Sequence, residues 1–394
     1  MLINENLKNN TYKIITNENS EQDLDQLSKE DLSKIKKIFE YSRIESYLIN
    51  NKIFKRFDKE TATSLKDKVD KRNINSMTIF KDFVDICRDL QEIDIKIIPL
   101  KGLHLNLEFY DDITFRPIRD IDLLLSKNEI KRFLKHLQKK DYFLKNDAKK
   151  DLQDIEISDF RYDIPNLINK NNTHLEIHHR IFDKNKVGDL KINEIFFNNI
   201  VKKNFSTSSL FFLREEHLLL HIIYHATVKS GFDVGIVALI DAKNIIEKDE
   251  IDFNYLQKIV KEFNLEKPVS IFLNILKKRF NLNIDNKFLF HSNYDKAEVI
   301  DNFEDLIFFN ESSYIFESSH IFLRIFEKDF FSDLIAGFSK TAITREIKGD
   351  RQPFFARARK LLRFFGLLIK FITLFLFKRE FRIDIIKNSS LKRE

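Results

Sequence analysis

Two aspartates spaced two residues apart are the first residues in this sequence that could do chemistry. Asp120 and Asp122 open the apolar run DIDLLL, residues 120–125. In a strand, side chains two apart leave the same face, so both carboxylates could reach one cation. Hard divalent cations such as Mg²⁺ take carboxylate oxygens together with the phosphate oxygens of a substrate. The same spacing recurs at Asp23 and Asp25 in a polar helical stretch, so spacing alone is not specific.

A third acid lies in a later run. Glu176 belongs to the stretch HLEIHHRI, residues 174–181, whose alternation and β-branched content predict a strand. His178 comes two residues after Glu176 and therefore shares its strand face. Two carboxylates on one strand and a third on a neighbouring strand would build a site for phosphoryl or nucleotidyl transfer.

Basic residues that could meet a phosphate lie near these acids in the sequence. Lys101 and Gly102 stand at a strand-to-helix turn, where a cation and backbone N–H groups can meet an anion. Arg116 and Arg119 could bind phosphates through bidentate hydrogen bonds. These four residues are candidate nucleotide-binding groups.

Hydrophobic periodicity indicates the elements that must position these residues. Short β-branched runs predict strands at 95–100, 120–125 and 174–181. Ser126 and Glu129 form a capping box that opens a helix directly after the second strand. Residues 146–172 are charged and irregular, which predicts a surface excursion. Apolar spacings of three and four predict further helices at 28–57, 73–90, 103–110, 210–229, 234–248, 252–264, 267–281 and 297–310.

This order of elements predicts an α/β core between helical flanks. The chain has 394 residues, enough for two or three domains at about 100–200 residues each. We predict an N-terminal helical segment (1–91), the α/β core (92–205), a helical domain (206–345) and a basic amphipathic C-terminal helix with its tail (346–394).

Composition excludes several classes of protein. Hydrophobic residues make up 43% and charged residues 32%, which excludes wholesale disorder. The single cysteine, Cys87, excludes a disulfide framework and a multi-cysteine metal site, and favours the cytoplasm. Cys87 lies on an apolar helix stripe and is predicted to be core. The net charge of +6 permits a polyanionic partner without demanding one.

Three histidines recur at every fourth residue of a predicted helix. His217, His221 and His225 could contribute to a zinc site, form a wall of the active site, or simply pack. A zinc site would need a third ligand from another segment. His178, His221 and His225 are the candidates for an active-site wall.

The C-terminal segment combines basic and apolar residues. Residues 353–378 fit a basic amphipathic helix on a membrane surface or a partner, or a terminal helix packed on its own domain. The basic run 345–363 would be a solvated face or would meet an anionic lipid or nucleic acid. Aromatic residues are not interleaved with basic ones on a β platform, so nucleic acid is not indicated as a partner.

Several of these segments together resemble one family. The runs LKG (residues 100–102), RP (116–117) and DIDLL (120–124) resemble an uncharacterised bacterial nucleotidyltransferase family of the polymerase-beta-like superfamily. The run EIH (176–178) is similar to that family's strand carrying the third acid. The later LLH (219–221), His225 and Asp241 also match its helical stretch, and the resemblance covers about residues 30–250.

The resemblance implies a fold, a reaction and roles for individual residues. The fold would be α+β, a small mixed β-sheet nucleotidyltransferase core flanked by an N-terminal helical segment and a mainly α-helical C-terminal region. Asp120 and Asp122 would bind two Mg²⁺ ions, with Mn²⁺ as an alternative, and Glu176 would complete the catalytic site. Lys101 and Arg116 would hold the β- and γ-phosphates of a nucleoside triphosphate.

The sequence does not specify the acceptor of the transferred nucleotide. Two interpretations other than this enzyme also stay open. A catalytically inactive nucleotide- or partner-binding protein could keep the same fold. A peripheral membrane adaptor could act through residues 353–378, which would make the location cytoplasmic but membrane-peripheral.

Overall fold

The computed structural model describes most of the first 289 residues. Described are residues 5–18, 20–90, 95–157, 163–182, 191–205, 208–230, 234–248 and 250–289, with 300, 301, 304 and 307. All of them belong to one compact unit, Leu2–Phe308. The predicted C-terminal helix at 353–378 and the basic run at 345–363 lie outside the described residues, and the predicted domain boundaries stay predictions.

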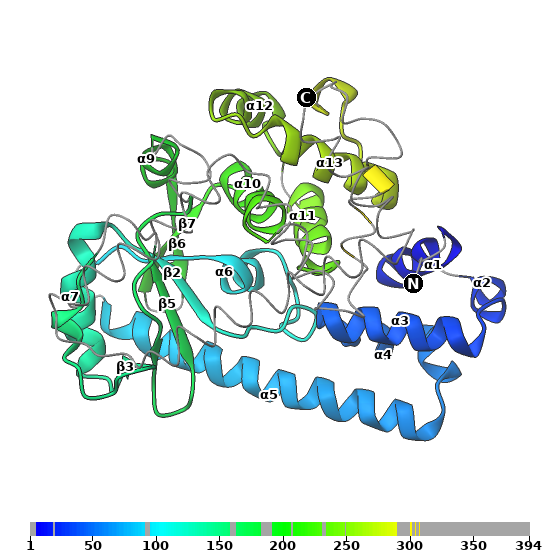
Figure 1. Cartoon of the computed structure of the whole chain (residues 1–394), viewed down its shortest axis with the longest axis horizontal. Coiled ribbons are helices and arrows are strands. Elements are labelled where there is room, and N and C mark those ends of the chain that lie inside the picture. The colour runs from blue at the N-terminus through cyan, green and yellow to red at the C-terminus, as the bar shows by residue number, and fades with distance from the viewer. Residues whose placement is uncertain are drawn as a thin grey trace, which may run out of the picture. The chain divides into compact units, whose positions relative to one another are not determined.

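A five-stranded mixed sheet forms the core of the fold (Figure 1). Its order is β1 (Ile98–Pro99), β2 (Ile121–Leu124), β5 (His174–His178), β4 (Leu167–Ile168) and β3 (Phe143–Leu144). Strands β2 and β5 pair in parallel, and the other neighbours pair antiparallel. The predicted α+β class with a small mixed sheet is confirmed. Strands β1, β2 and β5 are each shorter than the ranges predicted for them.

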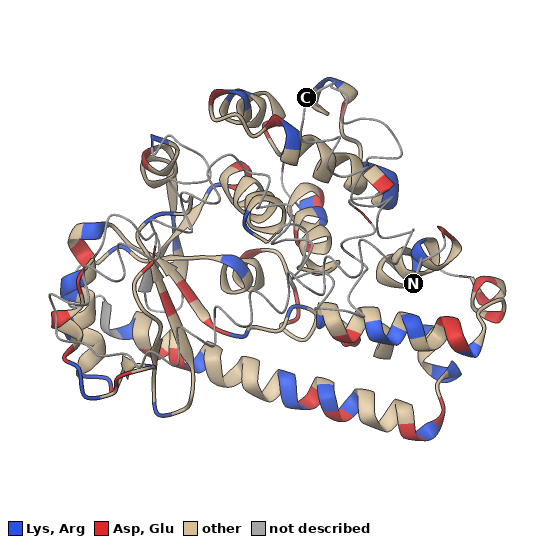
Figure 2. Ribbon diagram, viewed as in Figure 1, with Lys and Arg blue, Asp and Glu red and all other residues tan. Residues whose placement is uncertain are grey.

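Two helices share a hydrophobic core with this sheet. Helix α5 (Lys59–Leu90) contributes its second half, where Ile79, Phe83 and the predicted core residue Cys87 are buried. Figure 2 shows that the first half of α5 instead carries closely spaced basic and acidic residues. Helix α7 (Lys127–Gln138) begins at the predicted capping box and buries the apolar stripe Ile130, Phe133, Leu134 and Leu137.

The remaining helices form a second core. It joins α1 (Glu5–Thr16) and α3 (Lys29–Ser42) to α10 (Glu215–Tyr224), α11 (Val237–Lys248), α12 (Phe253–Glu262) and α13 (Glu266–Phe280). Helix α10 continues into a π-helical turn, His225–Lys229. Shorter helices are α2 (Glu21–Asp25), α4 (Glu45–Ile49), α6 (Lys101–Glu108) and α9 (Lys191–Asn198), with 3₁₀ turns at Lys52–Arg56, Leu152–Asp154 and Asn286–Phe288. Among the described helices, none has the length and apolar character needed to cross a membrane.

The helix predicted over 210–229 is wrong in its first part. Residues Ser208–Leu213 are strand β7, which pairs antiparallel with β6 (Ile200–Phe205). The backbone N–H of Phe211 also donates to the carbonyl of Ile97 at 3.3 Å. Leu210 and Phe212 are buried, so alternate residues face the core. A short apolar run carries no period that separates a strand from a helix, and these tertiary pairings decide it.

Three other predicted ranges differ from the structure. The helix predicted over 28–57 is interrupted at Arg43, whose φ of +58° ends α3 in the left-handed region. The helix predicted from residue 73 begins at Lys59. The segment 146–172 is more than a surface excursion, because Leu152 and Ile155 are buried and β4 lies within the sheet.

A buried cation joins the two ends of the described chain. The Arg279 guanidinium of α13 pairs with both carboxylate oxygens of Glu304 and lies 2.6 Å from Oε1 of Glu5 on α1. It also donates to Oδ1 of Asn9 at 2.6 Å. The side chain of Arg279 is 3% exposed and that of Glu304 is 0% exposed. The first helix is therefore held to the last described segment by charge as well as by apolar packing.

Candidate active site

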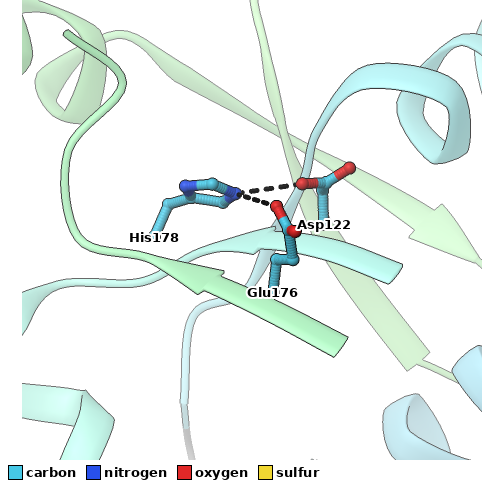
Figure 3. Close-up of side chains that lie close together, drawn as sticks. All are labelled: Asp122, Glu176 and His178. Carbon is cyan, nitrogen blue, oxygen red and sulfur yellow. Dashed lines mark hydrogen bonds and ion pairs between the residues drawn. The ribbon is translucent and has the colours of Figure 1, made fainter. Parts of the chain in front are cut away.

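The predicted carboxylates meet across the parallel pair of strands. The register places Asp122 of β2 directly beside Glu176 of β5, while Ile121 and Leu123 face the apolar core on the other side. Figure 3 shows both carboxylates and the His178 ring on the same side of the two strands. One ligand atom from each of these three residues lies within 4.8 Å of the others. The prediction that Glu176 and His178 share a face is confirmed.

Lys101 supplies a cation to this carboxylate pair. Its Nζ lies 2.6 Å from Oδ1 of Asp122 and 3.5 Å from Oε2 of Glu176. The backbone at Lys101 has a φ of +48°, a left-handed conformation that costs free energy in a residue with a Cβ. The turn is fixed on one side by the Leu100 N–H, which donates to the carbonyl of Asp122 at 2.9 Å. A strained turn therefore points a lysine at an acidic pair.

Burial and charge act in opposite directions on the two aspartates. Asp122 is 2% exposed, and burial alone would raise its pKa, but Lys101 and His178 outweigh burial and hold that pKa below its usual range. Burial and the nearby Asp122 charge raise the pKa of Asp120 to about 6. Lys101 and Arg119 oppose this shift, because each lowers the pKa of Asp120. The two carboxylates therefore titrate as an interacting pair.

His178 lies between the acids and is itself buried. Its Nε2 is 3.0 Å from Oδ1 of Asp122 and 3.7 Å from Oε2 of Glu176. The Asn166 side chain donates through Nδ2 to Oε1 of Glu176 at 3.1 Å. His178 can donate a proton to Asp122 through Nε2, or present the same nitrogen to a cation.

Arg116 is anchored from behind by a residue far away in the chain. Its Nε donates to both oxygens of Asp241 on α11, at 2.8 and 3.1 Å, and the Tyr110 hydroxyl donates to Oδ1 of Asp241 at 2.8 Å. A Cβ placed on Gly102 would lie 3.4 Å from Nη1 of Arg116. The guanidinium therefore lies beside the first turn of α6. Arg119 is exposed and lies near Asp120, whose pKa it lowers.

The helical histidines divide between the site and the packing. His221 and His225 line a small pocket together with Lys101 and His178. His217 is instead fully buried, stacks on Phe196 at a centroid distance of 4.1 Å, and is hydrogen-bonded to the Tyr255 hydroxyl at 2.8 Å. His217 is thus a packing residue, and the other two lie at the predicted wall.

A family model matches residues 28–281, which span the sheet, the acidic strands and most of the helical part. Its description is that of an uncharacterised nucleotidyltransferase. The chain belongs to this family. No curated protein matches the sequence. Among solved structures, the chain is similar to the lincosamide antibiotic adenylyltransferase LnuA in its lincomycin-bound form, with 19% sequence identity and a TM-score of 0.30. That match covers 43% of this chain and 97% of LnuA.

The donor set of this nucleotidyltransferase family member suits a divalent cation. Asp122 and Glu176 offer carboxylate oxygens, and His178 offers an imidazole nitrogen. The Lys101 ammonium already lies beside both acids, so the site attracts positive charge. Asp120 lies outside the tight group of three but close enough to interact electrostatically with Asp122.

Several residues at this site are absent from the sequence-based candidates. Arg180 and Lys229 line the same pocket as His178 and His225. A signal for both exists in the sequence, because Arg180 continues the alternation of Glu176 and His178, and Lys229 continues the four-residue spacing of the histidines. Asn166, by contrast, reaches Glu176 through the antiparallel packing of the sheet, and no sequence pattern indicates that contact.

Proposed function

We propose that this chain is a divalent-cation-dependent nucleotidyltransferase. It would move a nucleoside monophosphate from a nucleoside triphosphate to an acceptor hydroxyl or phosphate. Membership of the nucleotidyltransferase family supports the reaction type. The observation that carries the proposal is the pairing of Asp122 with Glu176 across parallel strands, with Lys101 beside both.

In the proposed reaction, an acceptor oxygen attacks the α-phosphorus in line. The bond from the α-phosphorus to the bridging oxygen of the β-phosphate breaks, and pyrophosphate leaves. Two Mg²⁺ ions, or Mn²⁺ in their place, would neutralise the triphosphate and lower the pKa of an acceptor hydroxyl.

The chain's own residues divide into acids, cations and a wall. Asp120, Asp122 and Glu176 would hold the metal, and Glu176 can also take the acceptor proton because it is the more exposed member of the strand pair. Lys101, Gly102, Arg116 and Arg119 would bind the nucleotide, with Arg116 held in place by Asp241. His178, His221 and His225 would form the wall of the site.

Cellular location is part of the proposal. Nucleoside triphosphates are cytoplasmic substrates, and a single cysteine suits a reducing compartment, so we propose a cytoplasmic enzyme.

Release of pyrophosphate tests the proposed function. The purified chain should release pyrophosphate from at least one of the four nucleoside triphosphates with Mg²⁺ or Mn²⁺ and a panel of hydroxyl and phosphate acceptors. Asp122→Asn and Glu176→Gln should each lower the rate at least about 100-fold, because each removes a charged metal ligand. Asp25→Asn, in the other Asp-x-Asp of the chain, is the matched control and should keep the wild-type rate.

Two outcomes would contradict the proposed enzymatic function. The first is a folded wild-type chain that releases no pyrophosphate with any combination of nucleotide, cation and acceptor. Nucleotide binding without release would then favour the catalytically inactive binding protein. The second is a wild-type rate in Asp122→Asn, which would move the chemistry away from these strands.

A further inference from the structure

A small pocket lies next to the carboxylate pair and is lined by cationic and imidazole side chains. Among the described residues that line it, none is acidic. Its polar groups come from the first residue of α6, from the end of β5 and the residues just after it, and from α10 with its π-helical extension. The side chains that matter here are those of Lys101, His178, Arg180, His221, His225 and Lys229.

The pocket adjoins the reaction site directly. Lys101 and His178 line it and also contact Asp122, at 2.6 and 3.0 Å. A ligand in the pocket would therefore lie one side chain away from the carboxylates. The pocket is small, and the Lys229 side chain in its lining is exposed.

The pocket contains a polar group with no protein partner. His221 is 4% exposed, and its Nδ1 makes no hydrogen bond. A buried polar atom without a hydrogen-bond partner destabilises the fold, and a bound ligand can supply that partner. The backbone beside it is also unusual, since His225–Lys229 forms a π-helical turn, a feature that is frequent at functional sites.

Burial and neighbouring cations lower the pKa values of two groups in the pocket. Burial, then Lys101 and Lys229, lower the pKa of His225 to about 3. Burial and Lys101 also lower the pKa of Lys229. Lys101 therefore disfavours a second positive charge at His225 and at Lys229, and an anion beside Lys229 would relieve this repulsion.

A second cationic place lies at Gly102, the residue after Lys101, where the Arg116 guanidinium approaches. Gly102, in the first turn of α6, and the Arg116 guanidinium beside it do not belong to the pocket lining. The amino end of a helix next to an arginine suits the triphosphate of a nucleotide. A transfer reaction has two substrates, the nucleotide and the acceptor. If the nucleotide binds at Gly102 and Arg116, the pocket can bind the acceptor.

We propose that this pocket binds a phosphate group carried by the acceptor. This inference rests on the proposed function, because only a transferase has an acceptor. It narrows the acceptor class to phosphorylated molecules, and it assigns Arg180 and Lys229 as the specificity-determining cations.

Inorganic phosphate is the probe for this pocket. Calorimetric titration of the wild-type chain with phosphate should show binding, both alone and with saturating Mg²⁺ and α,β-methylene analogues of the four nucleoside triphosphates. Lys229→Gln and Arg180→Gln should each weaken phosphate binding about ten-fold, the loss expected for one charge-assisted hydrogen bond. Both variants should bind the analogues within about two-fold of wild type. Lys202→Gln, an exposed lysine of β6, is the matched control and should change neither affinity.

Three results would overturn the inference. The first is the absence of phosphate binding to the wild-type chain, and the second is wild-type phosphate affinity in both variants. An analogue that displaces phosphate and loses affinity in Lys229→Gln would instead assign the pocket to the nucleotide's own phosphates. The pocket proposal and the proposed function can fail independently. We expect Asp120→Asn to lose transfer activity but still to bind phosphate, so phosphate binding is measured without the reaction.

Discussion

The Nζ of Lys101 lies 2.6 Å from Oδ1 of Asp122, so a predicted nucleotide-binding cation is ion-paired with a predicted metal ligand. The same ammonium is 3.5 Å from Glu176. Lys101 thus neutralises the acids where a divalent cation would also bind. A metal and Lys101 should compete for Asp122, and a metal that takes over this charge would free the lysine for a phosphate.

Lys101→Met tests this competition. Without a divalent cation, the variant leaves the buried Asp122 carboxylate without its lysine partner, and its free energy of unfolding should fall by about 3 kcal/mol. Mg²⁺ should raise the thermal midpoint of the variant more than that of the wild type, because the ion replaces the missing charge. Lys243→Met, which removes a surface partner of Glu247, is the control. Equal Mg²⁺ shifts in the variant and the wild type would refute the competition.

Asp120→Asn should stabilise the metal-free chain at neutral pH. Because the folded-state pKa of Asp120 is raised to about 6, the folded chain holds this proton more tightly than the unfolded chain does. The resulting stability is present at low pH and is lost as the pH rises through about 6. The variant should therefore gain on the order of 1 kcal/mol at pH 7.5 and much less at pH 4.5.

Urea unfolding at both pH values, with a chelator present, measures this difference. Asp25→Asn serves as the control, because Asp25 is exposed and its pairing with Arg56 lies at the surface. A variant that is less stable than wild type at pH 7.5 would show that the charge of Asp120 is favourable in the fold.

Asp241→Asn should act on nucleotide binding through Arg116. The substitution weakens the two hydrogen bonds that hold the guanidinium, so KM for the nucleoside triphosphate should rise about ten-fold with a smaller change in kcat. Tyr110→Phe removes one hydrogen bond to Asp241 and should have a smaller effect in the same direction. Steady-state pyrophosphate release measures both constants. An unchanged KM in Asp241→Asn would exclude Arg116 from nucleotide binding.

Arg279→Met should destabilise the chain strongly. It leaves Glu304 buried without its fork of hydrogen bonds, at a cost of about 3–5 kcal/mol in the free energy of unfolding. Arg279→Met combined with Glu304→Gln should recover part of this loss. Lys170→Met is the control, because its side chain is 76% exposed and its pairing with Asp141 lies at the surface. A double variant no more stable than Arg279→Met would rule out the lost hydrogen bonds of Glu304 as the cause.

Local patterns in the sequence predicted the elements that carry the acids. The alternation of DIDLLL and HLEIHHRI indicates two strands, and Ser126 with Glu129 indicates the start of α7. These signals work because strand alternation and helix capping depend only on neighbours. The shared face of Glu176 and His178 follows from the same alternation.

Other features depend on contacts between distant segments. The pairing of Asp241 with Arg116 joins residues 125 positions apart, and no local pattern indicates it. The β6–β7 hairpin was missed because Leu210 and Phe212 become strand residues only when they pack against the sheet. Neither the opposition of Asp122 and Glu176 nor the direction of their strands follows from the sequence of either strand alone.

The link from Glu5 through Arg279 to Glu304 can form only late in synthesis of the chain, because it joins the first helix to the last described residues. At about 5–20 residues per second, α1 leaves the ribosome roughly 15–60 seconds before its partners on α13 exist. During that time the apolar face of α1, with Leu7 and Ile14, has no completed surface to cover it. The five-stranded sheet needs no residue beyond His178, so the acidic strands can pair first. We therefore expect the nascent chain to acquire its carboxylate site early and to depend on chaperones until α1 is captured.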